Sequence, residues 1–209
     1  MKKLLILITL ICSFAFAKSA QVVDIVSENI IKVKESSGVV KNIHLSGIEL
    51  FATVNNSNKN VSYKIRDILK EKTISYMKTK IKIGSNINYF VVAKDSYGVE
   101  KVWIDNYELN YLMVKEGYAI VNMKDKFLPT VFKNRMSIAM NYAKEKKLGL
   151  WKDSSVSMLA LVNKDIHMCG WKNSKINLGL TKNEVLEELK AHLPTSYQKE
   201  ELFILASSK

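Results

Sequence analysis

Lysines and one tyrosine gather in a short stretch near the middle of the chain, and their chemistry suits binding to an anionic polymer. The stretch KEKTISYMKTKIK contains Lys70, Lys72, Tyr76, Lys78, Lys80 and Lys82. Ammonium groups attract phosphates, and an aromatic ring offers a surface on which a nucleic-acid base can stack. The pattern predicts a polyanion-binding surface that does not read sequence, and a solvated helix face is the alternative explanation.

Histidines and cysteines are too scattered to predict a transition-metal site. The histidines are His44, His167 and His192, and none lies at zinc-binding spacing from another histidine or a cysteine. Cys12 belongs to an apolar N-terminal run. If that run is removed, Cys169 stands alone, so no internal disulfide forms and the core must stabilise the domain.

Length and charge limit the classes of protein to consider. The chain has 209 residues, 47% of them hydrophobic, which is enough for one well-buried core plus a small appendage. The formal net charge is +12, and every one of the 32 basic residues except Arg66 and Arg135 is lysine. Arginine makes the bidentate contacts that phosphate chemistry usually needs, so this composition favours electrostatic binding over catalysis.

The N-terminus has the features of an export signal. Two lysines precede an apolar run over residues 4–11, and an Ala-Phe-Ala tripeptide ends at Ala17. We therefore expect residues 1–17 to be a signal peptide, with cleavage after Ala20 as the alternative. No later segment approaches the roughly 18 consecutive apolar residues of a membrane helix. The mature chain is expected to have no transmembrane span and to be periplasmic or secreted, in a bacterium.

The apolar pattern predicts strands first, with helices between and after them. A helix should begin near Ile65 and end before Gly84, and another should cover Glu108–Lys115. This order favours a small closed β-barrel flanked by helices. The expected strands cover 22–33, 39–45, 86–93, 102–104 and 118–121, and a last helix covers about 129–147.

Several strings, in this order, carry a resemblance to a known family. IHLSGIEL (43–50) is similar to V-R-L-x-G-I-D-A-P-E, and AKEKKLGLW (143–151) to A-x-x-x-x-x-G-L-W. DSYGVEKVWIDNYELNYLMVKEGYAIV (95–121) is similar to D-x-Y-G-R-x-L-A-x-V followed by D-G-x-x-L-N-x-x-L-V-x-x-G-Y-A-x-V. These strings resemble the thermonuclease family of staphylococcal nuclease-like domains. The resemblance implies an α+β fold, a five-stranded OB-type barrel with about three helices over residues 21–151, and residues 152–209 as a short C-terminal α/β extension.

The resemblance also implies where a phosphodiesterase site would lie, and most of its chemistry is missing there. In the family a carboxylate acts on water, two arginines grip the phosphate, and carboxylates hold a calcium ion. The arginine positions fall on His44 and Val99, and the general-base position falls on Ala52. The calcium positions include Asn29 and Glu49, of which only Glu49 keeps a carboxylate. We therefore expect no catalytic or metal-binding residue at these positions, and no cofactor unless calcium serves a divergent nuclease.

The positive charge belongs to the predicted barrel rather than to the extension. Residues 18–151 contain 22 basic and 13 acidic side chains, whereas residues 152–209 contain 8 and 7. This distribution is typical of a nucleic-acid-binding domain. Within the extension, a capping box at Thr181–Glu184 predicts a helix, which offers a surface to a partner in the cell envelope.

Three functions are compatible with these features. We favour an exported, catalytically inactive thermonuclease-like domain that binds DNA, RNA or another polyanion. The alternative is an envelope protein–protein interaction module that uses the barrel and residues 152–209. The third is a divergent metal-dependent phosphodiesterase that uses Glu49 and His44. A continuous lysine face with an exposed tyrosine would favour the first function, an apolar patch the second, and convergent carboxylates the third.

Overall fold

The computed structural model of the chain describes residues 17–51, 63–105 and 108–162. In chain order its elements are β1 (Lys18–Ser27), β2 (Ile30–Glu35), β3 (Val40–Leu45), β4 (Ile48–Glu49), α1 (Tyr63–Lys80), β5 (Asn86–Lys94), β6 (Glu100–Ile104), α2 (Glu108–Lys115), β7 (Ile120–Val121), α3 (Thr130–Glu145), α4 (Leu150–Asp153) and α5 (Ser155–Val162). Residues 1–16, Ala52 and residues 163–209 lie outside the described part. The expected signal peptide and the capping box are therefore not tested.

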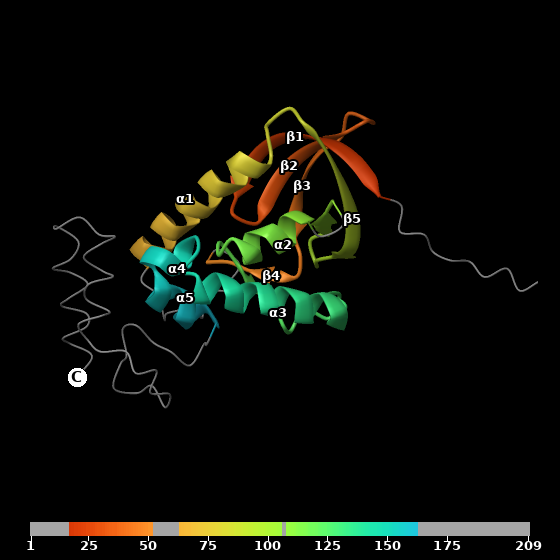
Figure 1. Cartoon of the computed structure of the whole chain (residues 1–209). Coiled ribbons are helices and arrows are strands. Elements are labelled where there is room, and N and C mark those ends of the chain that lie inside the picture. Colours follow the sequence, from red (N-terminus) through yellow and green to blue (C-terminus); the bar gives the residue numbers. More distant parts are fainter. Residues whose placement is uncertain (1–16, 52–62, 106–107, 163–209) are drawn as a thin grey trace, which may run out of the picture.

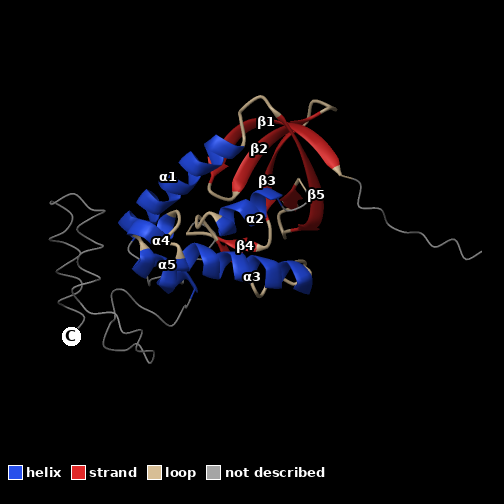
Figure 2. Cartoon of the chain, viewed as in Figure 1, coloured by secondary structure: helices blue, strands red, loops and turns tan. Residues whose placement is uncertain are grey.

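Five strands close into a barrel in the order β1-β2-β3-β6-β5 (Figure 2). Neighbouring strands are antiparallel except for β3 and β6, which run parallel, with Ile43 opposite Glu100 and Leu45 opposite Val102. Two further short strands, β4 and β7, pair beside the barrel. This architecture confirms the α+β barrel with helices that the sequence predicts. None of the helices in the described ranges is long and apolar enough to cross a membrane.

The strand expected over residues 22–33 is wrong in one respect, because it is two strands. β1 begins earlier, at Lys18, and ends at Ser27, and Glu28 and Asn29 form a turn before β2. The turn is held against the barrel because the Asn29 carbonyl accepts a hydrogen bond from Leu45 N at 2.9 Å. A hairpin turn around Gly38 joins β2 to β3. Its turn requires glycine-like geometry, with φ +84° at Gly38.

Two clusters of buried side chains form the core. The larger cluster fills the barrel and the space between the barrel and α2 and α3. The smaller one joins α1 to α4 and α5, and it contains Trp151, whose exposed fraction is 2%, as expected for a core residue. Met158 and Leu161 of α5 are buried in the same cluster, so the first helix beyond residue 151 packs into this core. Figure 1 shows α1, α4 and α5 on one side and α3 beneath the barrel.

Two glycines bring the end of α2 against the start of α4. Gly117 lies just after the end of α2, and its carbonyl accepts a hydrogen bond from Leu150 N at 3.0 Å. A Cβ at Gly117 would lie 2.3 Å from the Leu148 carbonyl oxygen, and one at Gly149 would lie 2.3 Å from the Glu116 carbonyl oxygen. These two backbones therefore touch directly.

Asn110 ties α2 to the barrel. Its Nδ2 donates a hydrogen bond to the Ser46 carbonyl at 2.7 Å, and its Oδ1 accepts one from Ile104 N at 3.4 Å. The side chain is 1% exposed, so this amide satisfies backbone groups that would otherwise be buried without partners. The contact fixes the segment between β3 and β4.

An ionic network closes one end of the barrel, with one residue from each barrel strand. Its members are Lys18, Glu35, Lys41, Tyr89 and Glu100. Lys41 pairs with both carboxylates, and its Nζ lies 2.7 Å from Glu100 Oε2. The Tyr89 hydroxyl donates to Glu35 Oε1 at 3.0 Å, and burial raises the pKa of Tyr89 to about 12. The network thus links strands that are distant in sequence.

Candidate functional site

A pocket of about 400 Å³ lies where four connecting segments meet at the barrel surface. These are the β1–β2 turn, the β3–β4 segment, the β5–β6 turn and the segment between β7 and α3. The pocket brings together three of the family positions, Asn29, His44 and Glu49. Val99 lies in the β5–β6 turn but does not line the pocket, and Ala52 is outside the described residues. The full lining is Asn29, His44, Leu45, Ser46, Gly47, Ile48, Glu49, Asp95, Lys101, Asn122 and Asp125.

The electrostatics of this pocket do not suit a phosphodiester. Its described lining carries carboxylates at Glu49, Asp95 and Asp125, and Lys101 is its only permanent cation. Burial lowers the pKa of His44, with Lys101 adding to the effect and Asp95 opposing it, so the imidazole is neutral at pH 7. A phosphoryl transition state gathers negative charge and needs fixed cations around it. This pocket supplies one lysine, Lys101, against three carboxylates.

The two aspartates serve the backbone of the turns. Asp125 Oδ2 accepts hydrogen bonds from Ser46 Oγ at 2.7 Å and Gly47 N at 2.8 Å, and its Oδ1 accepts one from Phe127 N at 2.8 Å. Asp95 Oδ1 accepts from Tyr97 N and Val99 N, both at 2.9 Å. Short Asp side chains commonly organise turns in this way. The role of Asp125 was not predicted from the sequence.

The donor set does not fit a calcium ion. Calcium takes six to eight oxygen ligands, normally including several carboxylates. Both oxygens of Asp125 and one of Asp95 already accept hydrogen bonds from the protein, and Asn29 supplies only a neutral amide. Over residues 17–51, 63–105 and 108–162, no three His, Cys, Asp or Glu side chains are grouped to hold a metal. The described residues therefore do not form the set of ligands that a calcium ion needs.

Glutamates next to the altered family positions do not restore the missing groups. Glu100 follows Val99, but it points into the barrel and pairs with Lys18 and Lys41. Glu28 precedes Asn29 and is fully buried. Successive side chains of a strand face opposite sides, which explains why Glu100 cannot take the place of an outward residue. Only Glu49 lines the pocket.

Of the six residues predicted to bind a polyanion, Lys72 and Tyr76 line one groove, and the other four do not line it. Tyr76 is 7% exposed, and its ring stacks on Tyr118 with centroids 4.0 Å apart and planes 12° apart. Lys80 lies over the Tyr76 ring and pairs with Glu116 at 3.1 Å. Lys72 faces Asp153 at 3.8 Å. Lys70 is half-buried, and Lys78 and Lys82 are exposed.

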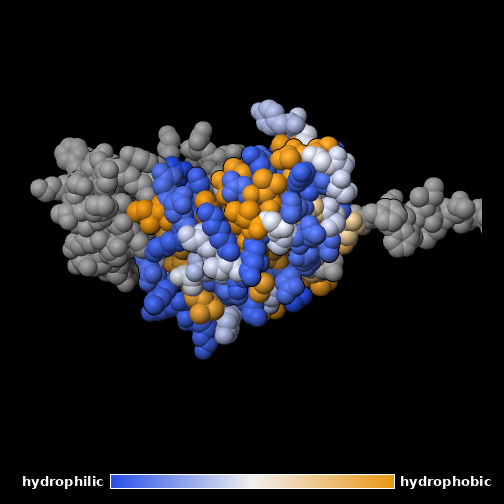
Figure 3. Space-filling model, turned by 90° about the horizontal axis from the view of Figure 1, so that it is seen from above, coloured by the Kyte–Doolittle hydropathy of each residue, from blue (hydrophilic) through white to orange (hydrophobic). Residues whose placement is uncertain are grey.

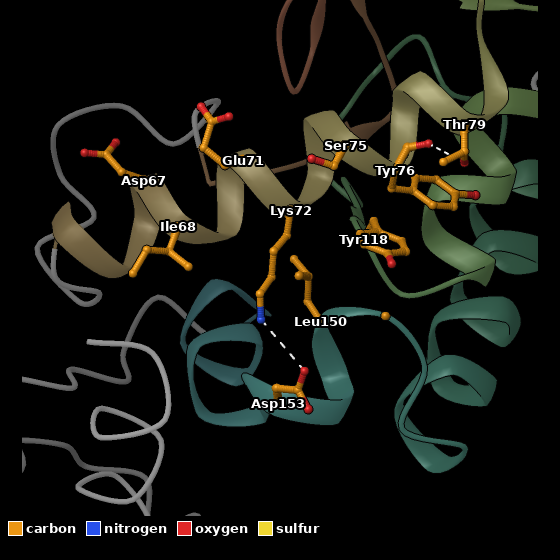
Figure 4. Close-up of a pocket in the computed structure, with 11 residues that line it drawn as sticks. Asp67, Ile68, Glu71, Lys72, Ser75, Tyr76, Thr79, Tyr118, Leu150 and Asp153 are labelled. Atoms are coloured by element: carbon orange, nitrogen blue, oxygen red, sulfur yellow. Dashed lines mark hydrogen bonds and ion pairs between the residues drawn. The ribbon is translucent and has the colours of Figure 1, made fainter. Parts of the chain in front are cut away.

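The groove that holds Lys72 and Tyr76 is acidic on balance. It has a volume of about 790 Å³ and runs between α1 and α4. Figure 4 shows Lys72 extending from α1 toward Asp153 of α4, with Tyr76 and Tyr118 lying against each other further along α1. Asp67 and Glu71 also line the groove, so three carboxylates oppose one ammonium group. The charges of the lining itself therefore do not favour a polyanion.

A second basic surface lies on the outside of β2, β3 and β6. Lys32 and Lys34 alternate with the buried residues Ile31 and Val33, and they therefore point outward. His44 and Lys101 lie opposite each other on β3 and β6. Tyr97, in the adjoining β5–β6 turn, is 91% exposed. We call these five residues (Lys32, Lys34, His44, Lys101 and Tyr97) the outer barrel face.

The outer barrel face was not predicted from the sequence, because its lysines are far apart in the chain. The alternation of apolar and charged residues in IIKVKE and EKVWI nevertheless indicates that these lysines point outward. Acids adjoin this face in two places: Asp24 of β1 pairs in register with Lys32, and Glu49, Asp95 and Asp125 line the pocket that includes His44 and Lys101. Lys34 and Lys101 have no acid opposite them in the strand register. Seen from above, apolar side chains gather near the middle of the described part of the molecule, with hydrophilic side chains around them (Figure 3).

The comparison with known families agrees with this architecture. A family model described as staphylococcal nuclease homologue matches residues 42–153, which is more than half of the chain. No curated protein matches the chain at a significant level. A domain of this kind indicates a nuclease-related or nucleic-acid-binding function. The matched residues contain the strings that suggested the family, and they build three of the five barrel strands, so the chain belongs to the staphylococcal nuclease homologue family.

Proposed function

We propose that the protein is an exported, non-catalytic member of its family that binds nucleic acid, preferably single-stranded, through the outer barrel face. One contrast carries the proposal. The pocket at the family positions combines three carboxylates with Lys101, whereas the adjoining strand surface adds Lys32, Lys34 and the exposed ring of Tyr97.

The position of the outer barrel face supports binding. OB-type barrels bind oligonucleotides on the face of their second and third strands and on the adjoining loops. Lys32 and Lys34 occupy that second strand here, and the Tyr97 turn is one of the adjoining loops. Stacking of one base on an aromatic ring contributes about 1–3 kcal/mol. Stacking requires an unpaired base, which favours single strands.

The residue types at the family positions support the absence of catalysis. Removing a single donor from a transition-state site typically lowers the rate by about 10²–10³. In this chain the two arginine positions of the family are occupied by His44 and Val99, and burial lowers the pKa of His44. Neither side chain holds a positive charge at neutral pH.

Binding is tested with the chain from Lys18 onward, fluorescently labelled single-stranded and duplex DNA, and a salt series. Lys34→Glu with Lys101→Glu should weaken single-strand binding at least tenfold and flatten the salt dependence, because about 0.7 counterions are released per phosphate contact. Tyr97→Ala should weaken single-strand binding more than duplex binding. The matched control, Lys78→Glu with Lys82→Glu, changes the net charge by the same amount. Apart from the general effect of net charge on binding, it should change the affinity by no more than about twofold.

The opposite pattern would relocate or refute the function. If the control pair abolished binding and the Lys34 and Lys101 pair did not, the lysines around α1 would be the binding surface. Absence of binding at low salt would refute nucleic-acid binding. Cleavage should be absent with calcium or with chelator. Calcium-dependent cleavage that Glu49→Gln abolishes would instead establish a divergent nuclease.

A further inference from the structure

We infer that the groove between α2 and α3 is a docking site for an acidic amphipathic segment of another protein. The groove has a volume of about 510 Å³ and shares no lining residue with the pocket at the family positions. α3 is on the opposite side of the molecule from β1 and β2 (Figure 1). Its lining consists of Tyr111, Lys115, Val131, Asn134, Arg135, Ile138, Ala139 and Tyr142.

α3 presents a second apolar face to this groove. Val131 is 75% exposed, Ile138 is 72% exposed and Tyr142 is 47% exposed. Their spacing of seven and four residues aligns them along one side of the helix, over about 16 Å at 1.5 Å per residue. The core-facing residues Met136 and Ala143 lie on another side of α3. A linear apolar stripe of this length is typical of a groove that accepts a helical segment.

The charge around the stripe selects the partner. The Arg135 guanidinium lies 4.3 Å from the centroid of the Tyr111 ring, and Lys115 Nζ lies 6.0 Å from the same centroid. These contacts hold two cations at the wall of the groove. The lining contains no Asp or Glu. A complementary segment therefore carries apolar side chains at helical spacing with carboxylates beside them, because each carboxylate can pair with a cation.

The same charges argue against a second copy of this chain. A symmetric pair would place Arg135 and Lys115 of one copy near those of the other, in a protein whose formal net charge is already +12. The concave shape argues against a flat lipid surface, because a groove accepts protruding side chains that a bilayer does not offer. Both occupants remain outcomes of the test.

The test selects helical 16-residue peptides from a displayed library on the full chain, with the Ile138→Asp variant as the counter-target. Position 138 is solvent-exposed, so the substitution should leave the fold intact, which circular dichroism and thermal melting check. Selected peptides should combine apolar residues at i, i+4 and i+7 with several Asp or Glu. In fluorescence titrations with a selected peptide, Ile138→Asp and Arg135→Glu should each weaken binding at least tenfold. The matched reversal Lys146→Glu, at the end of α3 and outside the lining, should change it less than threefold.

Several results would overturn the inference. These are selection of basic peptides, no enrichment over the counter-target, and equal binding by Ile138→Asp. Sedimentation that shows an Ile138-dependent dimer would identify a second copy as the occupant. Ile138-dependent binding to vesicles of phosphatidylglycerol, without peptide binding, would identify a membrane surface.

Discussion

Lys18 Nζ lies 2.8 Å from Glu100 Oε1 and joins the first strand of the barrel to β6. The other carboxylate oxygen of Glu100 accepts a hydrogen bond from Lys41 at 2.7 Å. The Glu100 side chain is 8% exposed, whereas that of Lys18 is 42% exposed. Glu100 is thus the buried centre of a network whose outer member remains partly solvated.

Replacement of Glu100 by glutamine should destabilise the protein by about 3 kcal/mol, the lower end for loss of one partner from a buried pair. The reason is that Lys41 would keep its charge in a partly buried site with Glu35 as its remaining carboxylate. Urea denaturation of the wild-type and variant chains measures the difference. The double variant Glu100→Leu with Lys41→Met should recover most of the loss, and failure to recover would show that the network has a role beyond charge compensation.

Stability should fall in acid, beginning below about pH 4.5. The hydrogen bond from Lys41 is the main cause of the lowered pKa of Glu35, which burial partly opposes. Burial would raise the pKa of Glu100, but hydrogen bonds from Lys18 and Lys41 outweigh it and the net shift is downward. Unfolded carboxylates therefore take up protons first, and the stabilisation is present above pH 4.5 and lost as pH falls through the folded-state pKa values. Free energies of unfolding from pH 7 to pH 3 test this, and the Glu100→Gln variant should show a shallower slope.

Signal cleavage, if it occurs, should follow Ala17 rather than Ala20. Cleavage after Ala20 would remove Lys18 from Glu100 and delete three pairings with β5, which are Lys18 with Tyr89, Ser19 with Asn88 and Ala20 with Ile87. N-terminal sequencing or intact mass of the exported protein distinguishes the two. A mature chain beginning at Gln21 would contradict the expectation, and it should also melt at a lower temperature than one beginning at Lys18.

Gly117→Ala should destabilise the protein by at least about 2 kcal/mol more than Gly84→Ala. Both glycines have positive φ, +82° and +87°, so each substitution incurs a similar backbone cost of roughly 1–2 kcal/mol. A Cβ at Gly84 meets nothing within 4 Å, whereas one at Gly117 meets a backbone oxygen at 2.3 Å. Thermal and urea denaturation measure both variants. Equal losses would show that the backbone near Leu148 moves aside easily.

Much of the fold follows from local sequence patterns. The α2 helix matches its predicted bounds, and the alternation of apolar residues correctly indicates most barrel strands. The boundary between β1 and β2 was not predicted, because the turn at Glu28 and Asn29 contains no glycine or proline and the apolar residues continue on both sides of it. A turn stabilised by the hydrogen bond between Asn29 and Leu45 depends on tertiary structure.

The candidate site was less predictable. Lys72 and Lys80 look free in the sequence, but their partners Asp153 and Glu116 lie 81 and 36 residues away. Tyr76 is buried because it follows Leu69 by two helical turns and lies on the same side of α1. This spacing of seven residues could have predicted its burial from the sequence. The convergence of Asp125 with Asp95 at one pocket depends on how distant turns meet, which no local pattern encodes.

The contact between the backbones at Gly117 and Gly149 separates two kinds of sequence constraint. Both glycines belong to strings that carry the family resemblance, EGYAIV and KLGLW, and the absence of space fixes them whatever the protein does. His44 and Val99, at the positions of the family's arginines, are half-buried and face no such restriction. A lineage can therefore exchange its chemistry while its recognisable sequence persists. In this chain the glycines of the family strings are constrained by backbone packing, whereas the residues at the family's arginine positions are not.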